Sequence, residues 1–504
     1  MTAIAPSRVP PSAGPASPAP PSLVLPSPVP DPSSPPHGRP RGRTALLRTT
    51  PMRIRALTIA AILAMAGLFA VTAVTFQNAR DGMQVIGHDA GPQVVATSDL
   101  YFALSDMDAQ IANALLIGPE RDLSGARQAA LDRYEQRRSE ANRAILQAAK
   151  LAGEDATEQR TVQAVLDGLG QYERLAGQAV LLDTESRHAP GPPPQKVTSV
   201  YREATDLMKL DLLPKAYNLT LDSGTTVRHS YEDQHAAISS GQGWVLLNGL
   251  VVILILAGLQ GYLAARFRRL ISPAIALAAL GTCALVIASV ALLSAEGRQM
   301  TKVKERGFDS VLALSRARAI SNSAYADESR YLLDPGRADT YEQVYLEKSQ
   351  ALLFVPAGSL DTYYRVLDDA LDRRGGSRKA DFLGFYGEAA RGVSLPGERR
   401  AVDDLLLSYL SFQRSDRRMR ELVSDGKRRD AIEIRTGGVP GGEDFERYDE
   451  ALTALIALHR DAFSSAVSDA DHRLRRWDLV LPCSVILIAA LVVAGVRPRL
   501  AEFR

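Results

Sequence analysis

Four long apolar runs constrain this chain more than any other feature of its sequence. They cover residues 56–76, 244–265, 274–293 and 479–496. Each run has about 18–22 residues without a charged side chain, the length of helix that crosses a hydrocarbon core roughly 30 Å thick. A buried helix of a soluble protein would carry a polar stripe over that length. The runs therefore predict four transmembrane helices in a multi-pass protein of the cell membrane.

The first run has one competing interpretation, a cleaved signal peptide. Its apolar part is longer than that of an ordinary signal peptide, and it begins behind a proline-rich segment of some 50 residues. We therefore treat residues 56–76 as a retained span.

The positions of the arginines predict the orientation of the spans. Six arginines lie between residues 39 and 55, and three more lie between residues 497 and 504. Between the second and third runs, the turn RFRRLISP (266–273) carries Arg266, Arg268 and Arg269. These three segments share one side of the membrane by parity, so the positive-inside rule places both termini and the turn in the cytoplasm. Three arginines between residues 473 and 476 argue the other way, but they end a long loop, where the rule is weak.

The two tryptophans support this orientation. Trp244 and Trp477 each begin an apolar run that descends from the outer face. Amphipathic rings prefer this depth, so both are predicted interfacial anchors. The two cysteines, Cys283 and Cys483, lie inside the third and fourth runs, and the external segments therefore have no disulfide framework.

The segments outside the runs divide into tails and two large external parts. Residues 1–50 are rich in proline and predict a disordered cytoplasmic tail, and residues 497–504 form a short second tail. Residues 77–243 and 294–476 are rich in Ala, Leu, Arg and Glu with a helical period, as at Leu100, Leu104, Met107, Ile111 and Leu115. The expected fold is all-α, with a four-helix bundle in the first external part and a more broken helical bundle in the second.

Short matches between the two external parts predict an internal duplication of the unit span–bundle–span. LLIGPE (115–120) corresponds to YLLDPG (331–336), and both parts then contain Tyr-Glu-Gln, at residues 134–136 and 341–343. The two tryptophans occupy corresponding places before the second and fourth spans.

No residue pattern indicates catalysis, a cofactor or a metal. The seven histidines are scattered, and His229 and His235, six residues apart, would point to different helix faces. The glycine-rich loop TGGVPGGED lacks the lysine of a phosphate-binding loop. With 59 basic against 57 acidic residues, the net charge of +2 does not indicate a nucleic-acid partner. The spans hold only mild polar residues, which favours hydrogen bonding between helices over an ion path.

This layout resembles the GlnX-type transmembrane proteins of actinobacteria. The segments YREATDLMKLDLLPKAYNLT (201–220) and ALTALIALHRDAFSSAVSDAD (451–471) are similar to segments of that group, and the resemblance covers roughly residues 50–500. It implies sensing of extracellular aspartate or glutamate through a solute-binding lipoprotein that docks on the outer bundles. It also implies a soluble serine/threonine kinase as the cytosolic partner. It fixes no ligand-binding residue.

The sequence thus favours a non-enzymatic sensor or transducer in the lipid bilayer. The alternatives are a transport-associated membrane component and a scaffold that anchors an external partner. So little of the chain faces the cytoplasm that an output would have to come from a partner. That partner would contact Arg266, Arg268 and Arg269 or the tails, unless these arginines only fix the orientation.

Overall fold

The computed structural model describes residues 50–84, 87, 91–119, 124–152, 155–267, 272–374, 382–436 and 443–501. Residues 54–504 form one compact unit. Within the described ranges the regular structure is helical, and the strand-like pairing there is an isolated bridge between Phe354 and Leu383. This agrees with the all-α fold expected from the sequence. The predicted tail 1–50 lies outside the described residues, apart from Thr50.

The first half of the chain contains six α-helices and one π-helical turn within the described residues. They are α1 (Thr50–Gln84), α2 (Gly91–Ile117), α3 (Ser124–Leu151), α4 (Ala156–Ser186), α5 (Gln195–Leu207), the turn η4 (Met208–Leu212) and α6 (Leu213–Phe267). Helix α2 ends at Ile117, directly before Gly118-Pro119. Proline has no N–H to continue the helical hydrogen bonds, so an end is predicted there. The π-helical turn η4 comes just before Leu213-Pro214 and widens the helix there.

The second half begins with another long helix and then breaks into shorter ones. They are α7 (Pro273–Lys302), the π-helical turn η5 (Val303–Phe308), α8 (Asp309–Leu333), the 3₁₀ turn η6 (Pro335–Arg337), α9 (Ala338–Leu352), α10 (Leu360–Arg374), α11 (Gly384–Arg391), α12 (Glu398–Ser424), α13 (Arg428–Arg435) and α14 (Asp444–Ala501). Helix α14 contains Pro482 and Pro498 in its interior.

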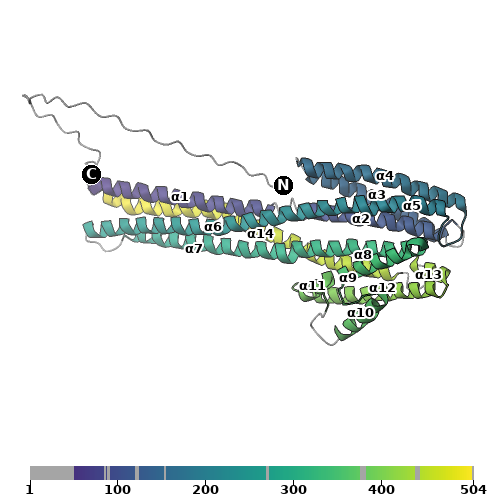
Figure 1. Ribbon diagram of the computed structural model, residues 1–504. Helices are drawn as coiled ribbons and strands as arrows, with labels where there is room; N and C mark the ends of the chain where they lie inside the picture. The colour runs from purple at the N-terminus through teal and green to yellow at the C-terminus, as the bar shows by residue number, and fades with distance from the viewer. Residues whose placement is uncertain are drawn as a thin grey trace, which may run out of the picture. The chain divides into compact units, whose positions relative to one another are not determined.

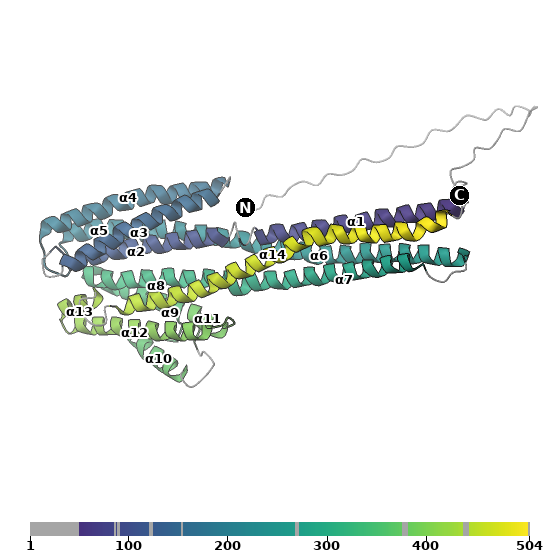
Figure 2. The same ribbon diagram turned by 180° about the vertical axis from the view of Figure 1, so that it is seen from behind.

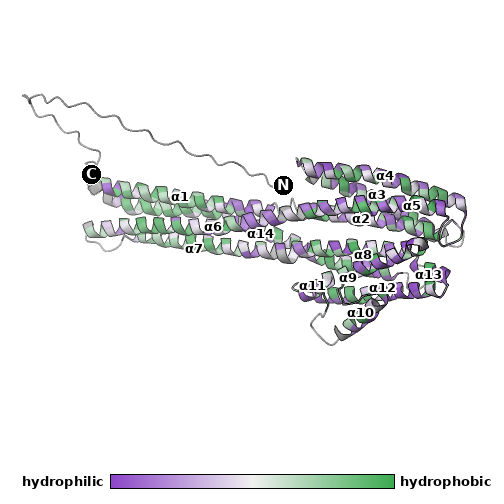
Figure 3. Ribbon diagram, viewed as in Figure 1, coloured by the Kyte–Doolittle hydropathy of each residue, from purple (hydrophilic) through white to green (hydrophobic). Residues whose placement is uncertain are grey.

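Four helices are long and apolar enough to cross a membrane. Their candidate spans are Met52–Gly82 in α1, Tyr231–Ala265 in α6, Pro273–Thr301 in α7 and Asp444–Pro498 in α14. The apolar parts of these helices lie side by side and are predominantly hydrophobic (Figures 1, 2 and 3). The chain is therefore a membrane protein with four candidate spans.

Helices α6 and α14 continue without interruption from the candidate spans into the polar part of the molecule. Helix α6 has 55 residues and α14 has 58, so at 1.5 Å per residue each is about 80 Å long. Because each is one helix, a rotation or shift at one end is carried mechanically toward the other.

The two external parts share an interface. Helix α2 packs along α3 on one side and along α8 on the other. A hydrophobic core built mainly from α2 to α6 also includes Leu332 and Leu333 of α8, together with Ile432 of α13. A second core lies within α8 to α14 and a third among the membrane helices. The two parts thus meet along α2 and α8, and the two separate bundles expected from the sequence stay a prediction.

Candidate functional site

Helices α2 and α8 form a central pair whose facing sides are buried although many of their residues are polar. Every residue of α2 from 102 to 117 is buried, and so are nearly all residues of α8 from 321 to 333. Buried polar groups are costly unless they find partners, so this pair must supply hydrogen bonds or ion pairs for each of them.

An ionic cluster supplies those partners, and we define it as Asp108, Lys209, Asp327, Arg330 and Lys348. The Arg330 guanidinium donates one Nη to Asp108 of α2 and the other to Asp327, one turn earlier on α8. Its side chain is 1% exposed, and both carboxylates are fully buried. Lys348 of α9 and Lys209 of η4 also donate to Asp327, the latter over 3.3 Å. Three cations and two carboxylates therefore meet where the two external parts join.

The carboxylate of Asp108 has further donors from the first external part. Tyr172 of α4 donates its hydroxyl over 3.1 Å, and Thr205 of α5 donates over 2.6 Å. A buried carboxylate with two neutral donors and a guanidinium is well compensated. The ionic cluster consequently joins α2, α4 and α5 with α8.

Burial and the neighbouring charges together shift the pKa values of Asp327 and Lys348. Burial alone would raise the pKa of Asp327, but Lys348, Arg330 and Lys209 outweigh it and hold that pKa well below its usual range. Burial lowers the pKa of Lys348 to about 8, although Asp327 opposes the change.

Three polar contacts flank the ionic cluster along the same interface. Ser329 of α8 donates its hydroxyl to the Asn113 side chain of α2 over 2.6 Å. Arg202 of α5 makes a two-pronged contact with Asp334, at 2.7 and 2.6 Å. Arg337 also pairs with an acidic residue of α5, over 3.3 Å. Such directional contacts fix the register of α2 and α5 against α8 more narrowly than apolar packing would.

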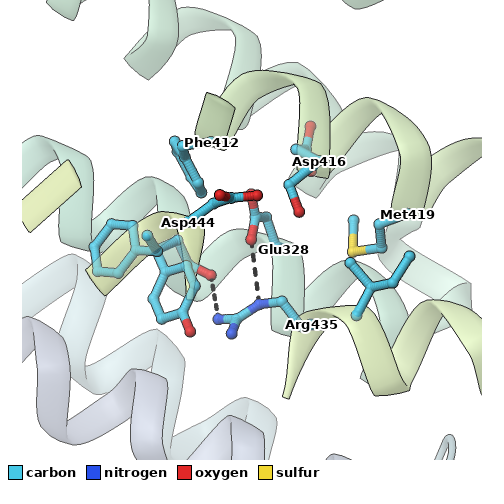
Figure 4. Close-up of a pocket in the computed structure, with 10 residues that line it drawn as sticks. Glu328, Phe412, Asp416, Met419, Arg435 and Asp444 are labelled. Carbon is cyan, nitrogen blue, oxygen red and sulfur yellow. Dashed lines mark hydrogen bonds and ion pairs between the residues drawn. The ribbon is translucent and has the colours of Figure 1, made fainter. Parts of the chain in front are cut away.

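The opposite side of α8 borders a polar pocket, shown in Figure 4. It is lined by Tyr325 and Glu328 of α8, Phe412, Ser415, Asp416 and Met419 of α12, Ile434 and Arg435 of α13, and Asp444 and Phe445 around the start of α14. Arg435 pairs with Glu328 over 3.2 Å and donates to the carbonyl oxygen of Tyr325 over 2.7 Å. Its guanidinium carbon lies 3.4 Å from the centre of the Tyr325 ring.

Glu328 and Asp416 form a close carboxyl pair in this pocket. Burial and the neighbouring Asp416 raise the pKa of Glu328 well above its usual range, in spite of Arg435. Asp416 accepts hydrogen bonds from Tyr364 and from Arg420, the latter over 3.0 Å. The Oδ1 atom of Asp416 and the Oε1 atom of Glu328 are buried, and a hydrogen bond between the two side chains adds to the raised pKa of Glu328. The raised pKa favours the protonated form of Glu328, which can donate to Asp416.

The two tryptophans singled out from the sequence belong to neither of these clusters. Trp244 is in α6 with 58% of its surface exposed, and Trp477 is in α14 with its ring 5.4 Å from that of Phe76 in an edge-on arrangement. Arg266 belongs to the last turn of α6, but its side chain is outside the described residues, as are Arg268 and Arg269. Their predicted roles as anchors and as a partner contact stay predictions.

Sequence reasoning missed the ionic cluster and the polar pocket. The signal for the former was the segment ADESR (326–330), which places acidic and basic residues in a helix expected to pack in a core. A motif search could not pair Arg330 with Asp108, because 222 residues separate them. Within the part of the chain that the structure describes, no three His, Cys, Asp or Glu residues lie close enough to hold a metal ion.

Residues 82–232 match the model of a family described as an actinobacterial sensor domain. The match begins in the last turn of α1 and ends within α6, and it contains Asp108, Tyr172 and Thr205. Neither the search of curated proteins nor that of solved structures found a match. The chain therefore carries a sensor-type domain joined directly to candidate membrane helices, as a membrane sensor protein does.

Proposed function

We propose that this protein is a non-enzymatic transducer that spans the membrane four times with both termini in the cytoplasm. The continuity of α6 carries the proposal. This helix starts inside the segment that matches the sensor domain, runs through a candidate span and ends at Phe267, within the turn predicted to face the cytoplasm.

The ionic cluster supports a route from the first external part to the second. A displacement of α2 or α5 would act on Asp327 and Arg330 of α8 through the buried charges described above. Helix α8 packs in turn against α14, which enters the fourth candidate span. Two packed arrangements of these helices would then differ at the cytoplasmic ends of α6 and α14.

We further propose the input and output that the resemblance to GlnX-type proteins implies. The input is extracellular aspartate or glutamate, delivered by a solute-binding lipoprotein that docks on α2 to α13. The output is a cytosolic serine/threonine kinase that contacts Arg266, Arg268 and Arg269 or the tails. Crosslinking in intact cells followed by mass spectrometry tests both partners, and recovery of neither would remove this part of the proposal.

The predicted duplication gains support from the contact between Asn113 and Ser329. The corresponding motifs LLIGPE and YLLDPG are offset by 216 residues, and Asn113 and Ser329 are separated by the same number. Contact between equivalent positions is what a two-fold axis between two copies produces. On this proposal α2 and α8 are the same helix of two fused copies, and one chain forms internally the pair that a shorter sensor would form by dimerisation.

Insertions into α6 test the transducer directly. One alanine inserted after Ser240 rotates the rest of the helix by about 100°, whereas seven residues restore the original face to within about 20°. Proximity labelling from a tag on the cytoplasmic tail, with and without the extracellular ligand, gives the readout. We expect the single insertion to abolish the ligand-dependent change and the seven-residue insertion to keep it.

The same variants distinguish the two rival functions. A scaffold that only anchors an external partner would not respond to either insertion, and partner binding would be equal in all variants. A transport-associated component would give uptake of labelled aspartate or glutamate into vesicles that contain this protein alone. Either result would favour the corresponding alternative function over that of a transducer.

A further inference from the structure

A groove opens between α1 and α14 near the outer end of their apolar stretches. It is lined by Phe69, Ala73, Phe76, Gln77, Arg80, Asp81 and Gln84 of α1 and by Trp477, Asp478, Leu481 and Pro482 of α14. Its volume is about 480 Å³.

The polarity of the groove changes along its length. The lining of α1 is apolar at Phe69, Ala73 and Phe76 and polar from Gln77 to Gln84. From the first to the last of these residues the helix rises about 22 Å, which spans the outer part of the hydrocarbon core and the headgroup region. Trp477 lies between the two zones, at the depth that indole rings favour. A molecule that fits this groove is apolar at the deep end and polar at the outer end.

The outer end offers groups for both charges of a zwitterion. Arg80 and Asp478 pair over 3.1 Å, yet 40% and 65% of their side chains are exposed, so both can take a further partner. Asp81 is exposed beside them. One cation and two carboxylates give the rim a formal charge of −1, which disfavours a ligand that is purely anionic.

A backbone acceptor adds to the same end of the groove. Pro482 has no N–H, so the carbonyl oxygen of Asp478, four residues earlier in α14, lacks its intrahelical donor. At the level of the headgroups such a group accepts from water or from a donor on a lipid headgroup. An ammonium group with N–H donors can satisfy it, and a quaternary ammonium cannot.

We propose that this groove binds a phospholipid with a primary ammonium headgroup, of the phosphatidylethanolamine type. One acyl chain lies against Phe69, Ala73 and Leu481, the phosphate faces Arg80, and the ammonium group donates to Asp81 and to the carbonyl oxygen of Asp478. The site lies at the place where α14 enters the membrane, and it is independent of the ligand proposed for the external part.

The two tryptophans provide the test, because only Trp477 lines the groove. The variant Trp244→Phe leaves Trp477 as the single fluorophore, and Trp477→Phe leaves Trp244, which reports contact with bulk lipid. Each is reconstituted into phosphatidylcholine vesicles with a minor fraction of brominated phosphatidylethanolamine, or with the same fraction of brominated phosphatidylcholine. Bromine on the acyl chain quenches a nearby indole. We expect a preference for phosphatidylethanolamine of about two- to fivefold at Trp477, the size of exposed charge contacts, and none at Trp244.

Three further variants in the Trp244→Phe background separate a specific site from general lipid contact. Ala73→Phe fills the groove and should abolish the preference, whereas Val74→Phe, at the next position of α1 and 59% exposed, should keep it. Asp81→Asn should reduce the preference and leave quenching by phosphatidylcholine unchanged. Equal quenching by both lipids at Trp477, or a preference that survives Ala73→Phe, overturns the proposal. Circular dichroism confirms that each variant is folded.

Discussion

Arg330 is enclosed by protein on every side and still carries a full charge. Burial disfavours that charge, but Asp108 and Asp327 outweigh the effect and raise the pKa of Arg330 well above its usual range. Because all three groups are desolvated, the contact contributes to stability only while it is complete. Removing one partner leaves the others buried and uncompensated.

We expect Arg330→Met to lower the free energy of unfolding by about 3–5 kcal/mol, the cost of breaking a buried ion pair. Equilibrium unfolding of the full chain in detergent measures this. Arg337→Met is the matched control, because Arg337 pairs across the same interface but is 40% exposed, and it should cost less than about 1 kcal/mol. Adding Asp108→Asn to Arg330→Met should recover part of the loss. Equal effects of Arg330→Met and Arg337→Met would contradict the buried cluster.

Glu328 makes stability depend on pH. Its pKa is raised in the folded state, by burial and then by Asp416. The folded state therefore binds more protons than the unfolded chain above pH 4.5, and stability falls as the pH rises from there toward the folded-state pKa. We expect Glu328→Gln to flatten this decline in thermal unfolding measured between pH 5 and 8. Glu347→Gln, an exposed carboxyl on α9, is the control, and an equally steep decline in Glu328→Gln would refute the assignment.

Close approach between helices requires glycine at a few positions of α6. A side-chain carbon at Gly241 would lie 2.3 Å from the Thr75 side chain of α1, and one at Gly249 would lie 2.4 Å from Val286 of α7. Both distances are far inside van der Waals contact. At these glycines the backbone of α6 therefore lies directly against side chains of α1 and α7. Small residues permit such close packing between membrane helices.

We expect Gly241→Leu to destabilise the protein by about 1–3 kcal/mol, since an added side chain must force α1 and α6 apart. Gly243→Leu is the matched control, because a side-chain carbon at Gly243 meets nothing within 4 Å. Thermal unfolding in detergent compares them. If both variants melt alike, the close contact between α1 and α6 is not present.

The orientation of the whole molecule can be tested with single cysteines. In a chain with Cys283→Ala and Cys483→Ala, we expect a membrane-impermeant maleimide added to intact cells to label Ser359→Cys, an exposed position in the part predicted to be external. It should label Ser272→Cys, which lies in the predicted cytoplasmic turn, only after the membrane is permeabilised. Labelling of Ser272→Cys in intact cells would reverse the proposed topology.

Much of the architecture was predictable because its signals are local. The four apolar runs, the end of α2 at Gly118-Pro119 and the helical period of α4 at Val162, Val165 and Leu169 each depend on neighbours in the sequence. The candidate site was not predictable, because Asp108 of α2 is separated from Arg330 of α8 by 222 residues. Their sequence surroundings resemble those of charged residues on a solvated helix face.

The sequence by itself determined that this chain is helical and has four candidate membrane spans, since length, hydropathy and period are properties of single segments. Tertiary structure decided that α2 faces α8, that charges are buried where they meet, and that the two external parts form one unit. Which helix faces meet depends on packing among many helices at once. An ion pair such as Asp108–Arg330 exists only after that packing has excluded water.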